Sequence, residues 1–145
     1  MDQSRIKVLF LCTGNAARSQ MAEALARLDH GELLDPVSAG SQPAGMVHRN
    51  AIRAVAELGA DISGARSKFA GEFLDTAFDV VVTVCDSAAQ DCPNWPNAKR
   101  IEHWSIEDPS FERDSTLRHQ RFVETRDDLR RRIDQLVESL QNQPS

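Results

Sequence analysis

A short apolar run that leads directly into a loop with a thiol, an arginine and a hydroxyl constrains the fold more than any other feature of this chain. The run covers residues 6–11, and the loop, residues 12–19, reads Cys-Thr-Gly-Asn-Ala-Ala-Arg-Ser. A nearly continuous apolar run ended by turn residues is typical of a strand buried in a parallel sheet. Apolar residues at helical spacing follow the loop. The sequence therefore predicts a strand over residues 5–11 and a helix over residues 17–30.

Further strands and helices alternate along the chain. We predict strands over residues 37–40, 78–84 and 99–104, and helices over residues 47–58, 69–74 and 117–140. Alternation of this kind favours an α/β fold with a parallel sheet. The charged run at residues 126–132 is interpreted as the solvated face of the last helix.

Composition and charge exclude several classes of protein. A chain of 145 residues is long enough for a core, and we expect residues 1–145 to form a single domain. The net charge of -5 argues against a general nucleic-acid binder. No apolar stretch approaches the roughly 20 residues that span a bilayer. The start of the chain shows no signal-peptide pattern, so we expect a cytoplasmic protein without membrane association.

The loop over residues 12–19 has the composition of an oxyanion site. Its backbone N–H groups can point at a tetrahedral anion together with the first turn of the helix that follows. These donors belong to Thr13, Gly14, Asn15, Ala16, Ala17 and Arg18. The guanidinium of Arg18 adds a planar fork for bidentate contacts. Since thiolates are favoured beside arginine and helix N-termini, Cys12 is a candidate nucleophile. The alternative is a buried cysteine in a tight turn.

Two more candidate catalytic groups follow predicted strands. Cys85 comes after the strand over residues 78–84, and Asp108 comes after the strand over residues 99–104. Because ligands bind beyond the carboxyl ends of parallel strands, we expect both to lie at the same sheet edge as Cys12. The alternative for Asp108 is a surface carboxylate before a proline, which is common in loops.

The spacing of Cys85 and Cys92 leaves two interpretations open. Residues seven apart in an intact helix are two turns, or about 10 Å, apart, whereas a disulfide needs Cα atoms within about 7 Å. Pairing therefore requires the segment to bend or unwind, and the segment is short, polar and followed by Pro93. Three cysteines in a reducing compartment suit nucleophilic or redox chemistry better than structural disulfides. The alternative is one buried cysteine and one incidental cysteine on a loop.

These motifs together resemble the low-molecular-weight protein tyrosine phosphatase superfamily, whose signature is Cys, five residues, Arg, Ser/Thr. Within it, the chain is most similar to the arsenate reductases of this fold, from Val8 to the final helix. The similarity includes residues 12–23, 37–40, 57–63, 67–68 and 108–109. It implies a three-layer sandwich with a central, mostly four-stranded parallel sheet.

The resemblance assigns roles to the candidate residues. It makes Cys12 the nucleophile and Arg18 the oxyanion clamp, and it implies that Ser19 bonds the Cys12 sulfur and favours the thiolate. Asp108 is then the general acid for the leaving oxygen. Asn15 would hold the loop through Ser38.

The same resemblance implies a relay of three thiols for arsenic detoxification. Cys12 attacks arsenate, Cys85 attacks the Cys12 sulfur as arsenite leaves, and Cys92 then attacks Cys85. Thioredoxin reduces the resulting Cys85–Cys92 disulfide; glutaredoxin or a small thiol could replace it as donor. Phosphate and sulfate are expected as analogues of arsenate. No tightly bound cofactor is expected, although Asn15, Glu23 and Ser38 resemble positions that bind potassium in some of these reductases.

Two other classes of protein remain open. One is a low-molecular-weight protein tyrosine phosphatase with incidental cysteines. The phosphatases of this fold usually carry aromatic residues after the Asp-Pro, but here Ser110 and Phe111 follow and the chain has no tyrosine. A wall for stacking phosphotyrosine is therefore weak or missing. The other class is a non-catalytic oxyanion sensor or thiol-based redox regulator.

Overall fold

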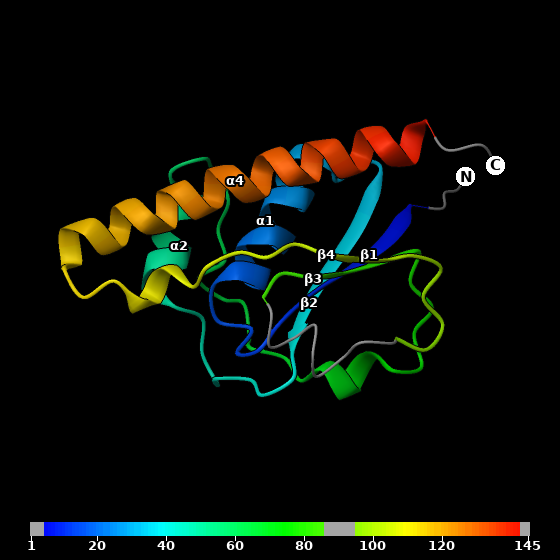
Figure 1. The fold of residues 1–145 in the computed structure, drawn as a ribbon, viewed down its shortest axis with the longest axis horizontal. Coiled ribbons are helices and arrows are strands. Elements are labelled where there is room, and N and C mark those ends of the chain that lie inside the picture. Colours follow the sequence, from blue (N-terminus) through cyan, green and yellow to red (C-terminus); the bar gives the residue numbers. More distant parts are fainter. Residues whose placement is uncertain (1–4, 86–94, 143–145) are drawn as a thin grey trace.

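A four-stranded parallel sheet, in the order β2-β1-β3-β4, forms the centre of the molecule (Figure 1). The structure is a computed structural model, and it describes residues 5–85 and 95–142. The strands are β1 (Ile6–Cys12), β2 (Leu34–Gly40), β3 (Val80–Thr83) and β4 (Ile101–His103), and the helices are α1 (Arg18–His30), α2 (Arg49–Ala56) and α4 (Ser115–Gln141). Two short 3₁₀ turns, η1 (Ala70–Phe73) and η2 (Pro109–Phe111), also lie in the described residues. The predicted α/β fold is confirmed.

The strand β1 holds the centre of the sheet because it pairs with strands on both sides. Val8 lies opposite Pro36 of β2 and opposite Val80 of β3. Its residues 8–12 are all buried, which explains why the apolar run is continuous instead of alternating. The loop that follows therefore begins from the most firmly held strand of the sheet.

The sheet is the middle one of three layers. Helices α1 and α4 contact each other and run along one side of the sheet, whereas η1 lies on the opposite side (Figure 1). The α1–α4 layer contributes large buried side chains, among them Met21, Leu25, Phe122 and Leu129. None of the helices in the described part of the chain is both long enough and apolar enough to cross a membrane.

Several predicted elements differ from the observed ones at their ends. The strand predicted over residues 37–40 begins earlier, at Leu34, and passes through Pro36. A proline is tolerated there because β2 is an edge strand and needs no hydrogen bond on its open side. The strand predicted over 78–84 is shorter, and Phe78 makes only an isolated bridge with Ala98. The segment predicted as a short helix over 69–74 is the 3₁₀ turn η1.

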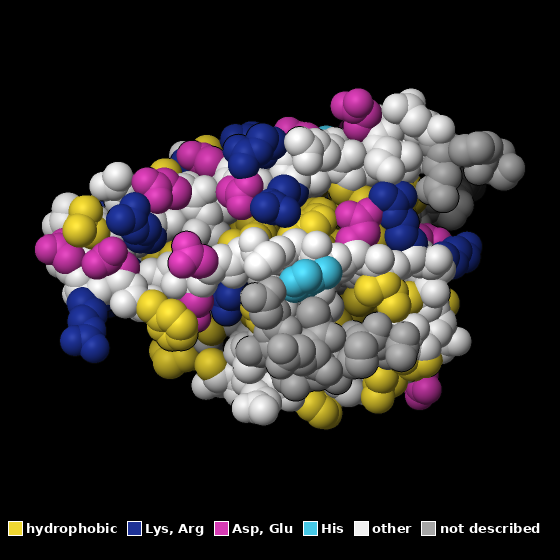
Figure 2. All heavy atoms as spheres, viewed as in Figure 1, with side chains coloured by type: hydrophobic (Ala, Val, Ile, Leu, Met, Phe, Trp, Pro, Cys, Tyr) yellow, Lys and Arg dark blue, Asp and Glu magenta, His cyan; other side chains and the backbone are white. Residues whose placement is uncertain are grey.

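The charges of α4 only partly match the predicted solvated face. Figure 2 shows basic and acidic side chains interspersed along this helix, and exposed pairs such as Arg131 with Asp128 lie within it. Arg130, however, bonds to Asp29 of α1 at 2.7 and 2.9 Å. Arg126 is 8% exposed. The arginines of this run therefore also hold α4 against the other helices.

Arg126 completes the end of α2. Its Nη1 donates to the carbonyl of Ala54 at 2.9 Å and to Glu57 at 3.0 Å. The carbonyls in the last turn of a helix lack partners within the helix, and a cation there also complements the helix dipole. A hydrogen bond from His119, helped by Arg126, holds the pKa of Glu57 below its ordinary value. One buried guanidinium thus joins α2 to α4.

We predict that Arg126→Ala lowers the free energy of unfolding by about 2 kcal/mol, because a buried carbonyl loses its charged donor. Urea denaturation measures this loss. Arg131→Ala is the matched control on the same helix: its side chain is 65% exposed, so its loss is expected below about 0.5 kcal/mol. Equal losses in the two variants would contradict this role of Arg126.

Candidate active site

The loop between β1 and α1 is turned so that backbone N–H groups face inwards. Four of its carbonyls accept hydrogen bonds from the N–H groups of a segment at residues 41–48, which we call the outer segment. The pairs are Cys12 with Ser41 (3.3 Å), Thr13 with Gln42 (2.9 Å), Gly14 with Ala44 (2.9 Å) and Ala16 with His48 (2.7 Å). Across a trans peptide the next N–H points the opposite way, so those of residues 13, 14, 15 and 17 turn away from the outer segment. This is the geometry of an oxyanion cradle.

Two features keep this cradle open and tightly folded. No side chain caps the N-terminus of α1 at Ala17, so the first N–H groups of the helix remain available to an anion. At the end of β2, Gly40 lets the loop pass closely. A Cβ there would lie 2.5 Å from the carbonyl oxygen of Thr13 and 2.9 Å from the amide nitrogen of Asn15. Any larger residue would displace the loop backbone.

The sulfur of Cys12 is buried and held by two contacts. Ser19 Oγ lies 2.8 Å from Cys12 Sγ, and the N–H of Asn15 donates to the same sulfur at 3.2 Å. Cys12 is 2% exposed and Ser19 is fully buried. Donors aimed at a sulfur stabilise its thiolate form, which is the nucleophile in cysteine chemistry.

Asn15 shapes the loop through an uncommon backbone conformation. Its φ is 48°, in the left-handed region that asparagine tolerates better than most residues. Its side chain is fully buried and makes three hydrogen bonds: Nδ2 donates to Ser19 Oγ at 2.8 Å, and Oδ1 accepts from the N–H of Lys68 at 2.7 Å and from Gln20 at 2.9 Å. These bonds hold a conformation that the backbone alone would not favour.

The expected link between Asn15 and Ser38 is wrong. Ser38 Oγ donates instead to Glu23 of α1 at 2.7 Å. In the sheet register Ser38 lies opposite Phe10, two residues before the end of β1, whereas Gly40 lies opposite Cys12. The Ser38 side chain therefore meets the second turn of α1 and not the loop.

Arg18 faces the segment that carries Asp108. Its Nη1 donates to the carbonyl of Ile106 at 2.8 Å, and its Nη2 lies 3.5 Å from Asp108 Oδ2. The other carboxylate oxygen, Oδ1, accepts from the N–H of Ser110 at 2.9 Å and from its hydroxyl at 2.6 Å. One oxygen of Asp108 is thus used to form the turn η2, while the other faces the arginine.

A cavity of about 630 Å³ brings the candidate residues from three strand ends together. Its lining includes Thr13 and Arg18 after β1, Cys85 after β3 and Asp108 after β4. Cys85 is 4% exposed, and its sulfur lies 3.5 Å from Thr13 Oγ1. The structure therefore places Arg18, Cys85 and Asp108 at one edge of the sheet, as expected. Cys92 lies outside the described residues.

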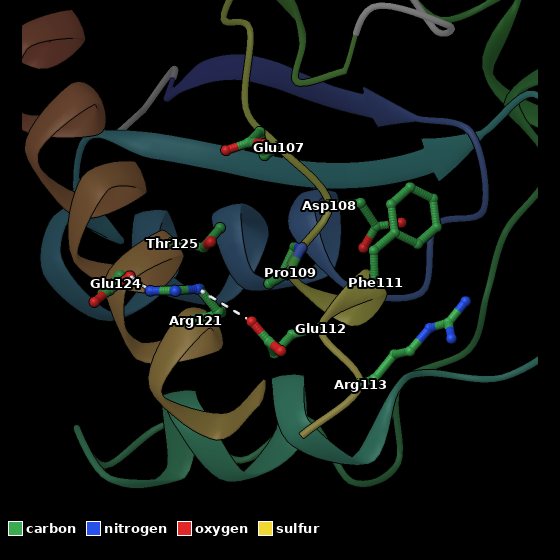
Figure 3. Close-up of a pocket in the computed structure, with 9 residues that line it drawn as sticks. All are labelled: Glu107, Asp108, Pro109, Phe111, Glu112, Arg113, Arg121, Glu124 and Thr125. Atoms are coloured by element: carbon green, nitrogen blue, oxygen red, sulfur yellow. Dashed lines mark hydrogen bonds and ion pairs between the residues drawn. The ribbon is translucent and has the colours of Figure 1, made fainter. Parts of the chain in front are cut away.

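A second cavity of about 550 Å³ adjoins the first and shares Glu107, Asp108 and Phe111 with it. In Figure 3 the side chains of Asp108 and Phe111 stand next to each other, and Arg121 of α4 points at Glu112. Arg121 also pairs with Glu124 at 3.1 Å, so two carboxylates balance its charge. Phe111 is 81% exposed, and its aromatic ring lies where the two cavities meet.

Sequence reasoning missed three residues that support the loop. Gln20 is 1% exposed and donates to Asn15 and to the carbonyl of Arg66. Ser67 Oγ donates to the carbonyl of Gly14 at 2.9 Å, and Lys68 holds Asn15 as described above. Residues 20, 67 and 68 belong to the stretches that resemble arsenate reductases, which was the available signal. Among residues 5–85 and 95–142, no three His, Cys, Asp or Glu side chains gather as metal ligands would.

Comparison with known proteins agrees with this geometry. The sequence profile of the family described as "Low molecular weight phosphotyrosine protein phosphatase" matches residues 7–145. The chain belongs to this family. It is 38% identical to an arsenate reductase of Halalkalibacterium halodurans over 133 residues, which cover 91% of this chain and 95% of the relative.

Several solved structures share the fold of this chain. An arsenate reductase in its phosphate-binding state superimposes with a TM-score of 0.79 at 31% identity, over 92% of this chain and 98% of the other. A thioredoxin-dependent arsenate reductase of Corynebacterium glutamicum gives a TM-score of 0.76 at 30% identity, over 97% of this chain and 64% of the other. The resemblance to arsenate reductases is thereby confirmed.

His48 connects the outer segment to α2 and α4. Its N–H bonds the loop at Ala16, its ring Nδ1 accepts from the N–H of Asn50 at 3.1 Å, and the ring packs on Phe122 with centroids 4.7 Å apart. Burial lowers the pKa of His48 from its ordinary 6.5; Asp108 opposes this shift, and Arg118 and Arg49 add to it. An accepting Nδ1 is available only in the neutral ring.

We predict that His48 makes the protein less stable as the pH falls below 6.5. The unfolded chain then binds a proton that the folded chain resists, so stability falls with pH by at most about 1.4 kcal/mol per pH unit. The measurement is urea denaturation between neutral and mildly acidic pH, with His48→Asn as the comparison, because asparagine can cap α2 without titrating. Parallel curves for the two proteins would contradict the prediction.

Proposed function

We propose that this protein reduces arsenate to arsenite, with Cys12 as the nucleophile and thioredoxin as the final reductant. One observation carries the proposal: a second buried thiol, Cys85, shares the cavity of Arg18 and lies against the loop that holds the Cys12 sulfur. A phosphatase needs one nucleophile at this site, whereas a reductase needs a second thiol to take the oxidising equivalents.

The first step is attack by the Cys12 thiolate on the arsenic of bound arsenate. The loop N–H groups and the Arg18 fork hold the arsenate oxygens. A sulfur–arsenic bond forms, and one oxygen leaves as water after protonation. Asp108 is the group suited to supply a proton, because its Oδ2 lies 3.5 Å from the arginine that would hold the anion.

The second step transfers the electrons. The Cys85 thiolate attacks Cys12 Sγ, and the sulfur–arsenic bond breaks with its electron pair on arsenic, which leaves as arsenite. A Cys12–Cys85 disulfide remains. Thiol–disulfide exchange needs access to the attacked sulfur, and the contact between Thr13 and Cys85 supports such access because it brings the second thiol against the catalytic loop.

The third step is proposed from the sequence, since Cys92 lies outside the described residues. Cys92 attacks Cys85, releases Cys12 as a thiolate and leaves a Cys85–Cys92 disulfide, which a dithiol reduces with two electrons. The similarity to a thioredoxin-dependent reductase supports thioredoxin as that dithiol. A reducing compartment such as the cytoplasm fits this cycle, because its thiols stay reduced between turnovers.

A nearby ammonium group disfavours a potassium ion near Asn15, Glu23 and Ser38. The ammonium of Lys68 lies 3.6 Å from Glu23 Oε1, the carboxylate oxygen to which Ser38 donates. A second cation beside this ammonium would meet like-charge repulsion in a largely buried place. The residues present therefore do not fit a bound potassium ion.

A coupled assay tests the proposal. Reduced protein is mixed with thioredoxin, thioredoxin reductase and NADPH, and NADPH oxidation is followed with and without arsenate. We expect oxidation over many turnovers that depends on arsenate, together with slow hydrolysis of para-nitrophenyl phosphate by the same loop. Cys12→Ser should abolish both activities. Fast hydrolysis without arsenate-dependent oxidation would assign the protein to the phosphatases.

We further predict that Cys92→Ser reduces no more than one arsenate per chain. Its Cys12–Cys85 disulfide would have no internal thiol to resolve it. Arsenite release and peptide mass spectrometry under non-reducing conditions measure the outcome. Cys85→Ser is the paired variant, and it should release no arsenite because nothing attacks Cys12. Sustained turnover by Cys92→Ser would refute the three-thiol relay.

A further inference from the structure

We propose that Lys68 is a positioning residue whose ammonium group is a built-in cation that fixes the catalytic loop. The inference deepens the proposed function, because it concerns the loop on which that function rests. It also explains why the residues near Glu23 do not suit a bound potassium ion. The charge that an added ion would bring is already present in the chain.

The ammonium is held in a largely buried polar setting. Lys68 Nζ donates to the carbonyl of Arg66 at 3.2 Å and lies 3.6 Å from Glu23 Oε1. The side chains of Lys68 and Glu23 are only 15% and 16% exposed. Charges this shielded from water interact more strongly than surface pairs do. The side chain therefore ties residue 68 to α1.

The backbone around Lys68 holds the catalytic loop at several points. Residues 66–68 form a segment that we call the bracket. Within it, the carbonyl of Arg66 accepts from Gln20, Ser67 Oγ donates to the carbonyl of Gly14, and the N–H of Lys68 donates to Asn15 Oδ1. The carbonyl of Lys68 accepts from the N–H of Gly40 at 2.8 Å. The bracket thus joins the loop to β2, and the Lys68 side chain is its charged link to Glu23 of α1.

The bracket, together with Gln20, sets the direction of the hydrogen bonds that reach the sulfur. A backbone N–H can only donate, so the bond from Lys68 requires that the oxygen of the Asn15 amide faces the bracket. The NH₂ group then faces Ser19 and donates to its Oγ at 2.8 Å. With Oγ accepting from Asn15, the hydroxyl proton is free to point at Cys12 Sγ, 2.8 Å away. Lys68 thereby acts on the thiolate through two intervening residues.

Removal of the Lys68 charge should leave the fold intact. Glu23 keeps Arg27 as a partner at 2.9 Å and Ser38 as a donor at 2.7 Å, so its carboxylate is not left unpaired. The expected change is a looser bracket. The Asn15 amide then samples other orientations, and the sulfur loses part of its donor set.

The test compares Lys68→Met, which removes the charge and keeps an apolar stem, with Lys68→Arg, which restores a cation. Lys99→Met is the matched control, since Lys99 is 81% exposed and pairs with Asp79 away from the loop. Two readouts are independent of arsenate reduction. One is the pH profile of Cys12 alkylation by iodoacetamide, read by peptide mass spectrometry, and the other is phosphate affinity by calorimetry. Both are measured in potassium chloride and in tetramethylammonium chloride at equal ionic strength.

We expect the wild type and Lys99→Met to give the same results in both salts. In Lys68→Met the alkylation midpoint moves to higher pH and phosphate binds about ten-fold more weakly, the loss expected for one charge-assisted contact. Potassium restores part of the loss because it can enter the vacated oxygen-lined space, while the larger tetramethylammonium ion cannot. Lys68→Arg should behave like the wild type.

Two results would overturn the proposal. One is a Lys68→Met protein with wild-type alkylation and phosphate binding, even if its stability is lower, since that would make Lys68 merely structural. The other is a wild-type protein whose alkylation profile or phosphate affinity depends on potassium. This comparison of the two salts tests the proposal even if the Lys68→Met variant fails to fold. A Lys68 effect without arsenate-dependent turnover would refute only the proposed function.

Discussion

The inward orientation of backbone N–H groups in the loop after β1 is the constraint on which the site depends. The outer segment takes up four loop carbonyls, and Asn15 adopts φ 48° so that its own N–H reaches the Cys12 sulfur. Neither condition is met by a free loop at low cost. The central position of β1, the close approach at Gly40 and the buried Asn15 network are what sustain it.

Burial of the two described thiols has two opposing consequences for the proposed reaction. Cys12 and Cys85 are 2% and 4% exposed, so both sulfurs are shielded from water and from other thiols. The same burial keeps a large reductant away from a disulfide between them. A third thiol that carries the disulfide outwards would remove this conflict, and Cys92 is the remaining cysteine of the chain. Access, more than reactivity, is thus the physical reason that the proposed relay would use three cysteines.

The parts of the structure that sequence could predict depend on local pattern and on general topology. The apolar run of β1, the helical spacing of α1 and the rule that sites follow parallel strand ends were enough to place Cys12, Arg18, Cys85 and Asp108 at one edge. The parts that it missed depend on contacts between distant segments. Lys68 meets Asn15 across 53 positions and Gln20 meets Arg66 across 46, and neither pair leaves a periodic trace. The partner of Ser38 depended on sheet register, which no single strand reveals.

Family membership and site geometry answer different questions. The family profile covers nearly the whole chain, yet the solved structures that it resembles include both an arsenate reductase and an arginine phosphatase. What separates them here is the chemistry around the loop: a second thiol beside Thr13, and one exposed aromatic, Phe111, where a phosphotyrosine wall would need more. These features, and not the fold, support the choice of arsenate over a phosphoprotein.

The central claim is that one loop both binds the oxyanion and carries the reacting sulfur. Protection of the reduced protein against alkylation tests it most directly, with the labelling rate of each cysteine followed by peptide mass spectrometry as phosphate is added. The account predicts that phosphate slows the labelling of Cys12 in a saturable manner and that arsenate analogues such as sulfate do the same. Labelling of Cys12 at an unchanged rate in saturating phosphate would contradict it.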